Sequence, residues 1–134
     1  MSVGVLLMTH PGIGSSLLHS AVRVYGKTPM PLRCVEVPID VSRERITQRA
    51  TQFIQQLDQG QGVLVLTDVY GATPDNIARS LIAGDKVSVL AGLNLPMLLR
   101  VFNYPTETLP NLFVKAIEGG TRGVYSDTQE NSDA

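Results

Sequence analysis

Residues 63–76, in the middle of the chain, read VLVLTDVYGATPDN and are the most informative about the fold. The first five residues are an unbroken apolar and β-branched run, which is typical of a parallel strand buried on both faces. Asp68 and a turn at Gly71 follow, and Thr73 and Pro74 then supply an N-cap and a first-turn proline for a helix. The segment therefore predicts a strand, a turn and a helix, the repeating unit of an α/β fold.

The same alternation extends in both directions along the chain. Strands are predicted at residues 3–8, 32–37, 63–67 and 86–91. Helices are predicted at residues 14–25 and 43–57, from residue 73 onward, in a short segment that follows residues 92–96 and ends at residue 102, and at residues 109–118. Strands that alternate with helices pair in parallel through right-handed crossovers. We therefore expect an α/β fold with a doubly wound, mostly parallel sheet in the order 2-1-3-4, flanked by helices. A short C-terminal antiparallel edge strand is predicted at residues 121–125, residues 1–125 are expected to form one domain, and residues 126–134 a polar tail.

Composition excludes several classes of protein. A chain of 134 residues with 43% hydrophobic and 17% charged residues is globular and fits one domain. The net charge of −1 provides no basic surface for nucleic acid, and no apolar run approaches the roughly 20 residues of a membrane-spanning helix. Cys34 is the single cysteine, and the two histidines do not stand at the spacing of metal ligands. We expect a cytoplasmic protein that uses no metal or cofactor and does not insert into the membrane.

Two polar side chains follow strands that are expected to be neighbours. His10 comes directly after the first predicted strand and Asp68 directly after the third. Because the carboxyl ends of parallel strands meet at a topological switch point, we expect these two side chains to lie together. A carboxylate that accepts the proton of one imidazole nitrogen leaves the other nitrogen free to attack a phosphoryl group. The pair predicts a catalytic nucleophile, His10, and the group that orients it, Asp68.

Gly71, Ala72 and Thr73 form a candidate phosphate-binding turn. Small residues before a helix leave backbone N–H groups free at its positive end, and the Thr73 hydroxyl can donate one more hydrogen bond. A carboxylate at Asp75 would repel an anion there, so we expect its side chain to point outward. On pattern alone, another interpretation stays open, in which His10 is a strand-end histidine bonded to backbone and Asp68 is a turn residue.

Three motifs in this chain resemble the IIA components of the mannose class of the phosphoenolpyruvate-dependent sugar phosphotransferase system. They are the strand that ends in Thr9-His10, residues 66–76, and residues 91–98, which read AGLNLPML. The resemblance extends from the first strand to Val124. It implies that His10 accepts a phosphoryl group from the phosphocarrier protein HPr, that Asp68 orients His10, and that residues 71–73 hold the phosphate. It also implies a IIB component on a separate chain as acceptor, and a homodimer in which residues 121–125 add a strand to the partner's sheet.

The chain departs from the family's pattern beside both candidate motifs. Pro11 stands where glycine usually follows the histidine, and Asp75 stands at a position that is often apolar. Three functions stay open. The first is a phosphotransferase that carries a phosphoryl group from HPr to a IIB component. The second is a regulatory binding module whose phosphorylation state at His10 controls a partner protein, and the third is a small-molecule binding domain without phosphorylation.

Overall fold

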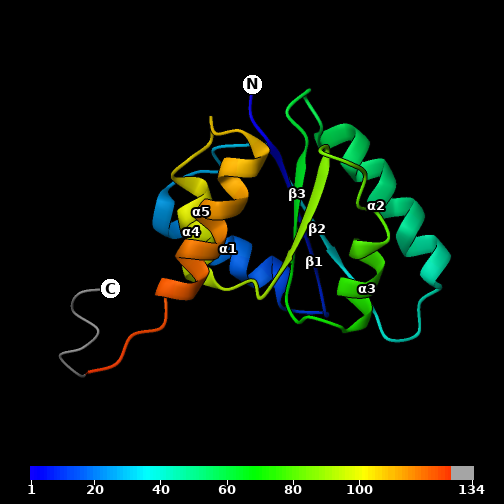
Figure 1. The fold of residues 1–134 in the computed structure, drawn as a ribbon. Coiled ribbons are helices and arrows are strands. Elements are labelled where there is room, and N and C mark those ends of the chain that lie inside the picture. Colours follow the sequence, from blue (N-terminus) through cyan, green and yellow to red (C-terminus); the bar gives the residue numbers. More distant parts are fainter. Residues whose placement is uncertain (128–134) are drawn as a thin grey trace.

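The computed structural model of this chain describes residues 1–127 and contains one parallel sheet (Figure 1). Within these residues the strands are β1 (Gly4–Thr9), β2 (Leu32–Glu36), β3 (Val63–Thr67) and β4 (Val87–Ala91). The helices are α1 (Gly14–Tyr25), α2 (Arg43–Leu57), α3 (Thr73–Arg79), α4 (Leu95–Phe102) and α5 (Leu109–Arg122). All strand pairs are parallel and their order is β2-β1-β3-β4. The α/β class and the strand order predicted from the sequence are confirmed; residues 128–134 of the predicted tail lie outside the described residues.

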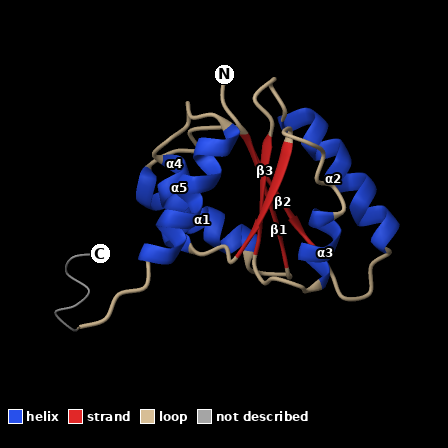
Figure 2. Cartoon of the chain, viewed as in Figure 1, coloured by secondary structure: helices blue, strands red, loops and turns tan. Residues whose placement is uncertain are grey.

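Helices cover both faces of the sheet, with α1, α4 and α5 on one side and α2 and α3 on the other (Figure 2). Successive side chains of a strand point to opposite faces, so each central strand contributes to two cores. In β3, Leu64 and Leu66 pack with α1, α4 and α5, whereas Val63 and Val65 pack with α2 and α3. Every residue of β1 and β3 is buried. This two-sided burial explains why both strands are continuous apolar runs.

The switch point of the sheet lies between β1 and β3. The chain leaves β1 toward β2 at one edge and leaves β3 toward β4 at the other, and Met8 of β1 lies opposite Thr67 of β3. The carboxyl ends of the two strands therefore lie side by side. They carry His10 and Asp68 to the same end of the sheet, which is where a parallel sheet places its ligands.

Helix α5 is longer than the sequence predicted. We expected it to end at Gly119, but it continues to Arg122. The structure also does not show the predicted edge strand over residues 121–125, since residues 123–127 form no strand. The reason is contact with α4: a Cβ atom on Gly119 would lie 2.4 Å from the Arg100 Cβ, and one on Gly120 would lie 2.7 Å from the Met97 Cε. The two glycines thus allow close helix packing and do not end the helix.

None of the helices described in residues 1–127 combines the length and the apolar character that crossing a bilayer requires.

Candidate functional site

The loop that carries His10 is fixed by the last residue of β1. The Thr9 hydroxyl is buried, accepts a hydrogen bond from the Gly14 N–H at 2.9 Å and donates to the His10 carbonyl at 2.8 Å. Gly14 also leaves no room for a side chain, because a Cβ there would lie 2.6 Å from the Cys34 Sγ. The backbone on both sides of His10 is therefore tied to the body of the protein.

Asp68 holds His10 at two points. One carboxylate oxygen, Oδ2, lies 2.7 Å from His10 Nδ1 and also accepts the backbone N–H of His10 at 3.0 Å. The other oxygen, Oδ1, accepts the backbone N–H of Val69 at 3.1 Å. The structure therefore brings together the two side chains that the sequence placed at one end of the sheet.

This geometry fixes which nitrogen of His10 is free to react. Burial of Asp68 opposes its ionisation, but hydrogen bonds from the backbone N–H and the ring of His10 outweigh burial and lower the pKa of the carboxyl below its usual value. An ionised carboxylate only accepts hydrogen bonds, so in the neutral imidazole of His10 it is Nδ1 that carries the proton and Nε2 that has the lone pair. The His10 side chain is 40% exposed and that of Asp68 only 5%. A reactant can therefore reach the imidazole while its partner stays shielded.

The three residues of the candidate phosphate-binding turn differ in which hydrogen-bond donors they leave free for a ligand. The Gly71 N–H donates to Asp75 Oδ2 at 3.0 Å, and the Ala72 N–H is directed to the Val69 carbonyl at 3.4 Å. Thr73 opens α3 and is exposed, and its hydroxyl has no hydrogen-bond partner among residues 1–127. The hydroxyl of Thr73 is therefore a polar group of this turn that is free for a ligand.

Asp75 does not point outward, which corrects the expectation from the sequence. Its side chain is fully buried, where Oδ1 accepts the Thr67 hydroxyl at 2.6 Å and Oδ2 accepts the Arg79 Nε at 2.8 Å. Burial raises the pKa of the Asp75 carboxyl, but the hydrogen bonds from Gly71, Thr67 and Arg79 and the charge of Arg79 lower it below its usual value. Sequence reasoning missed this network, although the spacing of four residues places Asp75 and Arg79 on one face of a helix.

Apolar side chains border the His10–Asp68 pair, a second feature that sequence reasoning missed. Ile13 is 39% exposed, Val69 54% and Tyr70 75%. They belong to the loops that carry His10 and Asp68, and Tyr70 is fixed by the Arg79 guanidinium, which lies 4.8 Å from the centre of its ring. Exposed apolar residues beside a reactive group are typical of a surface that another protein contacts.

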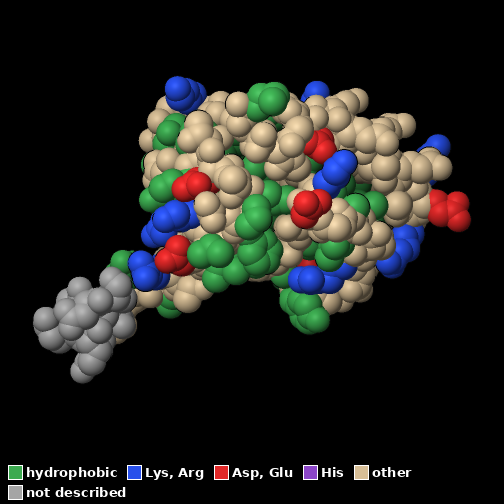
Figure 3. All heavy atoms as spheres, turned by 45° about the horizontal axis from the view of Figure 1, so that its top comes forward, with side chains coloured by type: hydrophobic (Ala, Val, Ile, Leu, Met, Phe, Trp, Pro, Cys, Tyr) green, Lys and Arg blue, Asp and Glu red, His purple; other side chains and the backbone are tan. Residues whose placement is uncertain are grey.

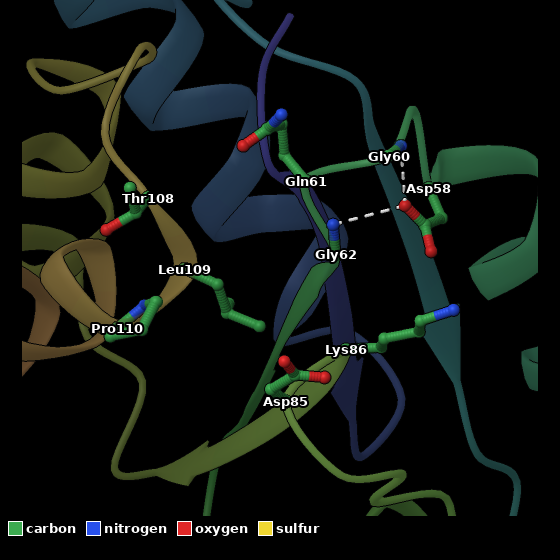
Figure 4. A pocket seen from close by; sticks show the side chains of 9 residues that line it. All are labelled: Asp58, Gly60, Gln61, Gly62, Asp85, Lys86, Thr108, Leu109 and Pro110. Carbon is green, nitrogen blue, oxygen red and sulfur yellow. Dashed lines mark hydrogen bonds between the residues drawn. The ribbon is translucent and has the colours of Figure 1, made fainter.

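A cavity of about 290 Å³ lies at the opposite end of the sheet, against the starts of β3, β4 and α5 (Figure 4). There the carboxylate of Asp58 accepts the N–H groups of Gly60 and Gly62, and Lys86 and Asp85 lie on the neighbouring strand start. Figure 3 tilts this end toward the reader and shows acidic and basic side chains interspersed among apolar ones. Because parallel sheets bind ligands at the carboxyl ends of their strands, we place the candidate site at His10 and Asp68 and not at this cavity. No group of three His, Cys, Asp or Glu side chains within residues 1–127 is placed to hold a metal ion.

Comparisons with known proteins agree with the fold and identify a family. The family described as PTS system fructose IIA component, where PTS is the phosphotransferase system, matches residues 4–117. The PTS system mannose-specific EIIAB component of Escherichia coli K12 is 28% identical over 127 residues, which cover 92% of this chain and 39% of that protein. The transcriptional regulatory protein LevR of Bacillus subtilis is 32% identical over 68 residues, which cover 50% of this chain and 7% of that protein.

A solved structure gives independent support for the fold. The mannose/sorbose-specific IIA subunit from Enterococcus faecalis superposes with a TM-score of 0.83, at 23% identity and with 96% of each chain covered. At this identity the likeness shows the fold alone. This chain spans about two fifths of the length of the Escherichia coli relative.

Proposed function

This chain belongs to the mannose-type family of PTS IIA components, and from that membership and the geometry of the site we propose that it carries a phosphoryl group on His10. The phosphocarrier protein HPr is the donor, and a IIB component on a separate chain is the acceptor. The chain then acts as a phosphotransferase of sugar uptake in the cytoplasm, where HPr and the IIB component meet it. The observation that carries the proposal is the 2.7 Å contact between His10 Nδ1 and Asp68, which leaves Nε2 as the nucleophile.

The reaction is an in-line transfer between two histidines. The lone pair of His10 Nε2 forms a bond to phosphorus while the N–P bond of the phosphorylated donor histidine breaks, and its electron pair returns to the donor nitrogen. The phosphorylated ring of His10 then carries a positive charge, which Asp68 stabilises through the proton on Nδ1. The same displacement at phosphorus, with the acceptor's histidine as nucleophile, passes the group onward. Rate enhancement comes mainly from holding the two rings in line.

The turn at residues 71–73 would hold the phosphoryl oxygens. The exposed hydroxyl of Thr73 is free to donate, and the start of α3 directs backbone N–H groups and a partial positive charge outward. The Gly71 N–H is already bonded to Asp75, so its contribution is to the shape of the turn and not to the phosphate.

Donor and acceptor are proteins on this proposal, and the border of the site suits a protein. Ile13, Val69 and Tyr70 expose apolar surface in the loops that carry His10 and Asp68. An apolar border of this kind excludes water around the transferring group once a partner is seated. The hypothesis of a small-molecule binding domain has less support, because the cavity of about 290 Å³ lies at the end of the sheet opposite to His10 and Asp68.

A regulatory role is the second candidate. The relative from Bacillus subtilis is a transcriptional regulatory protein, so a segment similar to this one occurs within a regulator. On that reading His10 is phosphorylated in the same way, and the phosphorylated state changes the binding of a partner instead of supplying a IIB component. The chemistry at His10 is common to both candidates.

The test uses labelled phosphoenolpyruvate with enzyme I and HPr, and follows acid-labile label on the parent, His10→Ala and His19→Ala proteins. His19 is the other histidine and is exposed on α1, so His19→Ala is the matched control. We expect label on the parent and on His19→Ala and none on His10→Ala. Label that survives in His10→Ala, or a parent that stays unlabelled beside charged HPr, would refute the proposal. Transfer of the label from His10 to a IIB component would then support the carrier function, and its absence would support the regulatory function.

A further inference from the structure

The backbone that carries Asp68 is held from both sides by one buried side chain, Asp75. Its Oδ1 accepts the hydroxyl of Thr67, the residue just before Asp68, at 2.6 Å. Its Oδ2 accepts the N–H of Gly71, three residues after Asp68, at 3.0 Å. The same oxygen binds Arg79, whose guanidinium lies over the ring of Tyr70 in the same segment.

We propose that Asp75 is a positioning residue for the reaction at His10, because it bridges Thr67 and Gly71 and thereby fixes Asp68 against His10 Nδ1. Its effect on the transfer rate rests on the proposed function. Its effect on the His10 ring does not, since the hydrogen bonds that transmit it are present in the unphosphorylated protein.

The end of β3 gives this bridge a rigid support. The Thr67 carbonyl accepts the N–H groups of Gly92 and Leu93 at 3.0 and 2.9 Å, so the residue before Asp68 is bonded through both its backbone and its side chain. The residue after Asp68 has no such support from the sheet, because β3 ends at Thr67. The bond between Asp75 and Gly71 ties the far side of the turn to the sheet through Thr67, and Asn76 Nδ2 also donates to the Gly71 carbonyl at 3.0 Å.

Arg79 makes a buried carboxylate tolerable at this position. A charge taken out of water is costly unless it is paired and its oxygens are hydrogen-bonded. Asp75 is fully buried and has three donors, one of which is the charged Arg79. The positive charge of Arg79 also offsets the repulsion that Asp75 would exert on a phosphoryl group held by the neighbouring turn. Asp75 and Arg79 therefore act as one unit.

The first measurement is made on the unphosphorylated protein. The nitrogen chemical shifts of His10 give the fraction of neutral rings that carry their proton on Nδ1, in the parent, in Asp75→Asn and in Asp85→Asn. Asp85 is an exposed carboxylate at the other end of the sheet and is the matched control. We expect the Nδ1–H fraction to fall in Asp75→Asn and to stay at the parent value in Asp85→Asn. An unchanged fraction in a folded Asp75→Asn protein would overturn the proposal.

The second measurement is a double-mutant cycle on the rate of phosphoryl transfer from HPr. We expect Asp75→Asn alone to slow phosphoryl transfer by about tenfold, because an effect of this size is typical of residues coupled through one hydrogen-bond network. In the Asp68→Asn background the same change should have almost no further effect, because Asp75 acts through Asp68. A tenfold loss in both backgrounds would show a general structural role and would overturn the proposal.

A further variant covers the case in which Asp75→Asn does not fold. Thr67→Val removes one of the three donors to Asp75 and keeps the shape of the side chain. We expect a smaller fall in the Nδ1–H fraction and in the transfer rate, again absent in the Asp68→Asn background. A folded Thr67→Val protein with parent values for both would count against the bridge. If His10 is not phosphorylated at all, the proposed function fails while the ring measurement still decides the role of Asp75.

Discussion

At the scale of single residues, the site depends on two carboxylates in different surroundings. Asp68 is nearly buried and faces His10, which is exposed to partners, whereas Asp75 is fully buried and faces the backbone of the turn. Both have a pKa below the usual value, since hydrogen bonds to the ionised form outweigh burial in each case. On the proposed function, Asp68 orients the nucleophile His10, and Asp75 holds the segment that carries Asp68.

The lowered pKa of Asp75 predicts how stability depends on pH. A carboxyl whose pKa is lower in the folded than in the unfolded protein stabilises the fold above its unfolded value of about 4 and loses that contribution as pH falls through the folded value. We therefore expect the difference in unfolding free energy between the parent and Asp75→Asn to be largest at neutral pH and to shrink in acid. Urea unfolding at pH 7 and pH 3 measures it, with Asp85→Asn as control. A difference that is equal at both pH values would contradict the assignment of Asp75 as an ionised, bonded group.

At the scale of helices and strands, the alternation of apolar runs with amphipathic stretches was enough to predict the fold. The four strands and their order agree with the structure, because buried parallel strands such as β3 leave a clear mark in residues 63–67. The meeting of His10 and Asp68 followed from that order. The pattern did not reveal what Gly119 and Gly120 do, since a glycine that ends a helix and one that lets two helices approach look alike in a single sequence.

Asp75 was misplaced for a related reason. A carboxylate in the first turn of a helix is usually solvated. Its burial here depends on Arg79, four residues along the same helix, and on Thr67, which the folded chain brings to it. The exposed border of Ile13, Val69 and Tyr70 was likewise hidden, because exposure is a property of the packed molecule. Sequence therefore predicted that His10 and Asp68 lie together, and missed the groups that support and surround them.

The contact between α4 and α5 gives a test of the corrected helix boundary. Gly119→Ala would place a Cβ atom 2.4 Å from the Arg100 Cβ, so the two helices must move apart. We expect a loss of about 1–3 kcal/mol in the unfolding free energy, in the range of overpacked cores. Denaturant unfolding measures it, and Glu118→Ala, which precedes Gly119 on the same helix, is the control. A Gly119→Ala protein as stable as the parent would mean that α5 does not pack on α4 this closely.

At the scale of the whole molecule, the chain leaves apolar surface and a strand edge open. Val124 is 81% exposed and Tyr125 69%, both in residues 123–127, and β4 is the last strand at its side of the sheet. Open edges invite pairing with another chain. The family resemblance implies a homodimer in which the C-terminal segment adds to the partner's sheet. Because Thr121 and Arg122 belong to α5, we propose that Val124 and Tyr125 make the contact with the partner.

Light scattering after size exclusion tests this assembly. We expect the parent to elute with twice the chain mass, and the Val124→Asp/Tyr125→Asp double variant to elute as a monomer that is still folded. Val24→Asp, at a residue of α1 that is 68% exposed, is the control and should remain dimeric. A monomeric parent at all concentrations, or a double variant as dimeric as the parent, would contradict the assembly.

The most direct test of the central claim is the position of the phosphoryl group on the His10 ring. Because Asp68 holds the proton on Nδ1, we expect phosphorus to be bonded to Nε2. Phosphorus–nitrogen coupling in the protein labelled with ¹⁵N and phosphorylated through HPr identifies the bonded nitrogen. A coupling to Nε2 of His10 is the expected result. A coupling to Nδ1, or phosphorus on any residue other than His10, would refute transfer through Nε2 of His10.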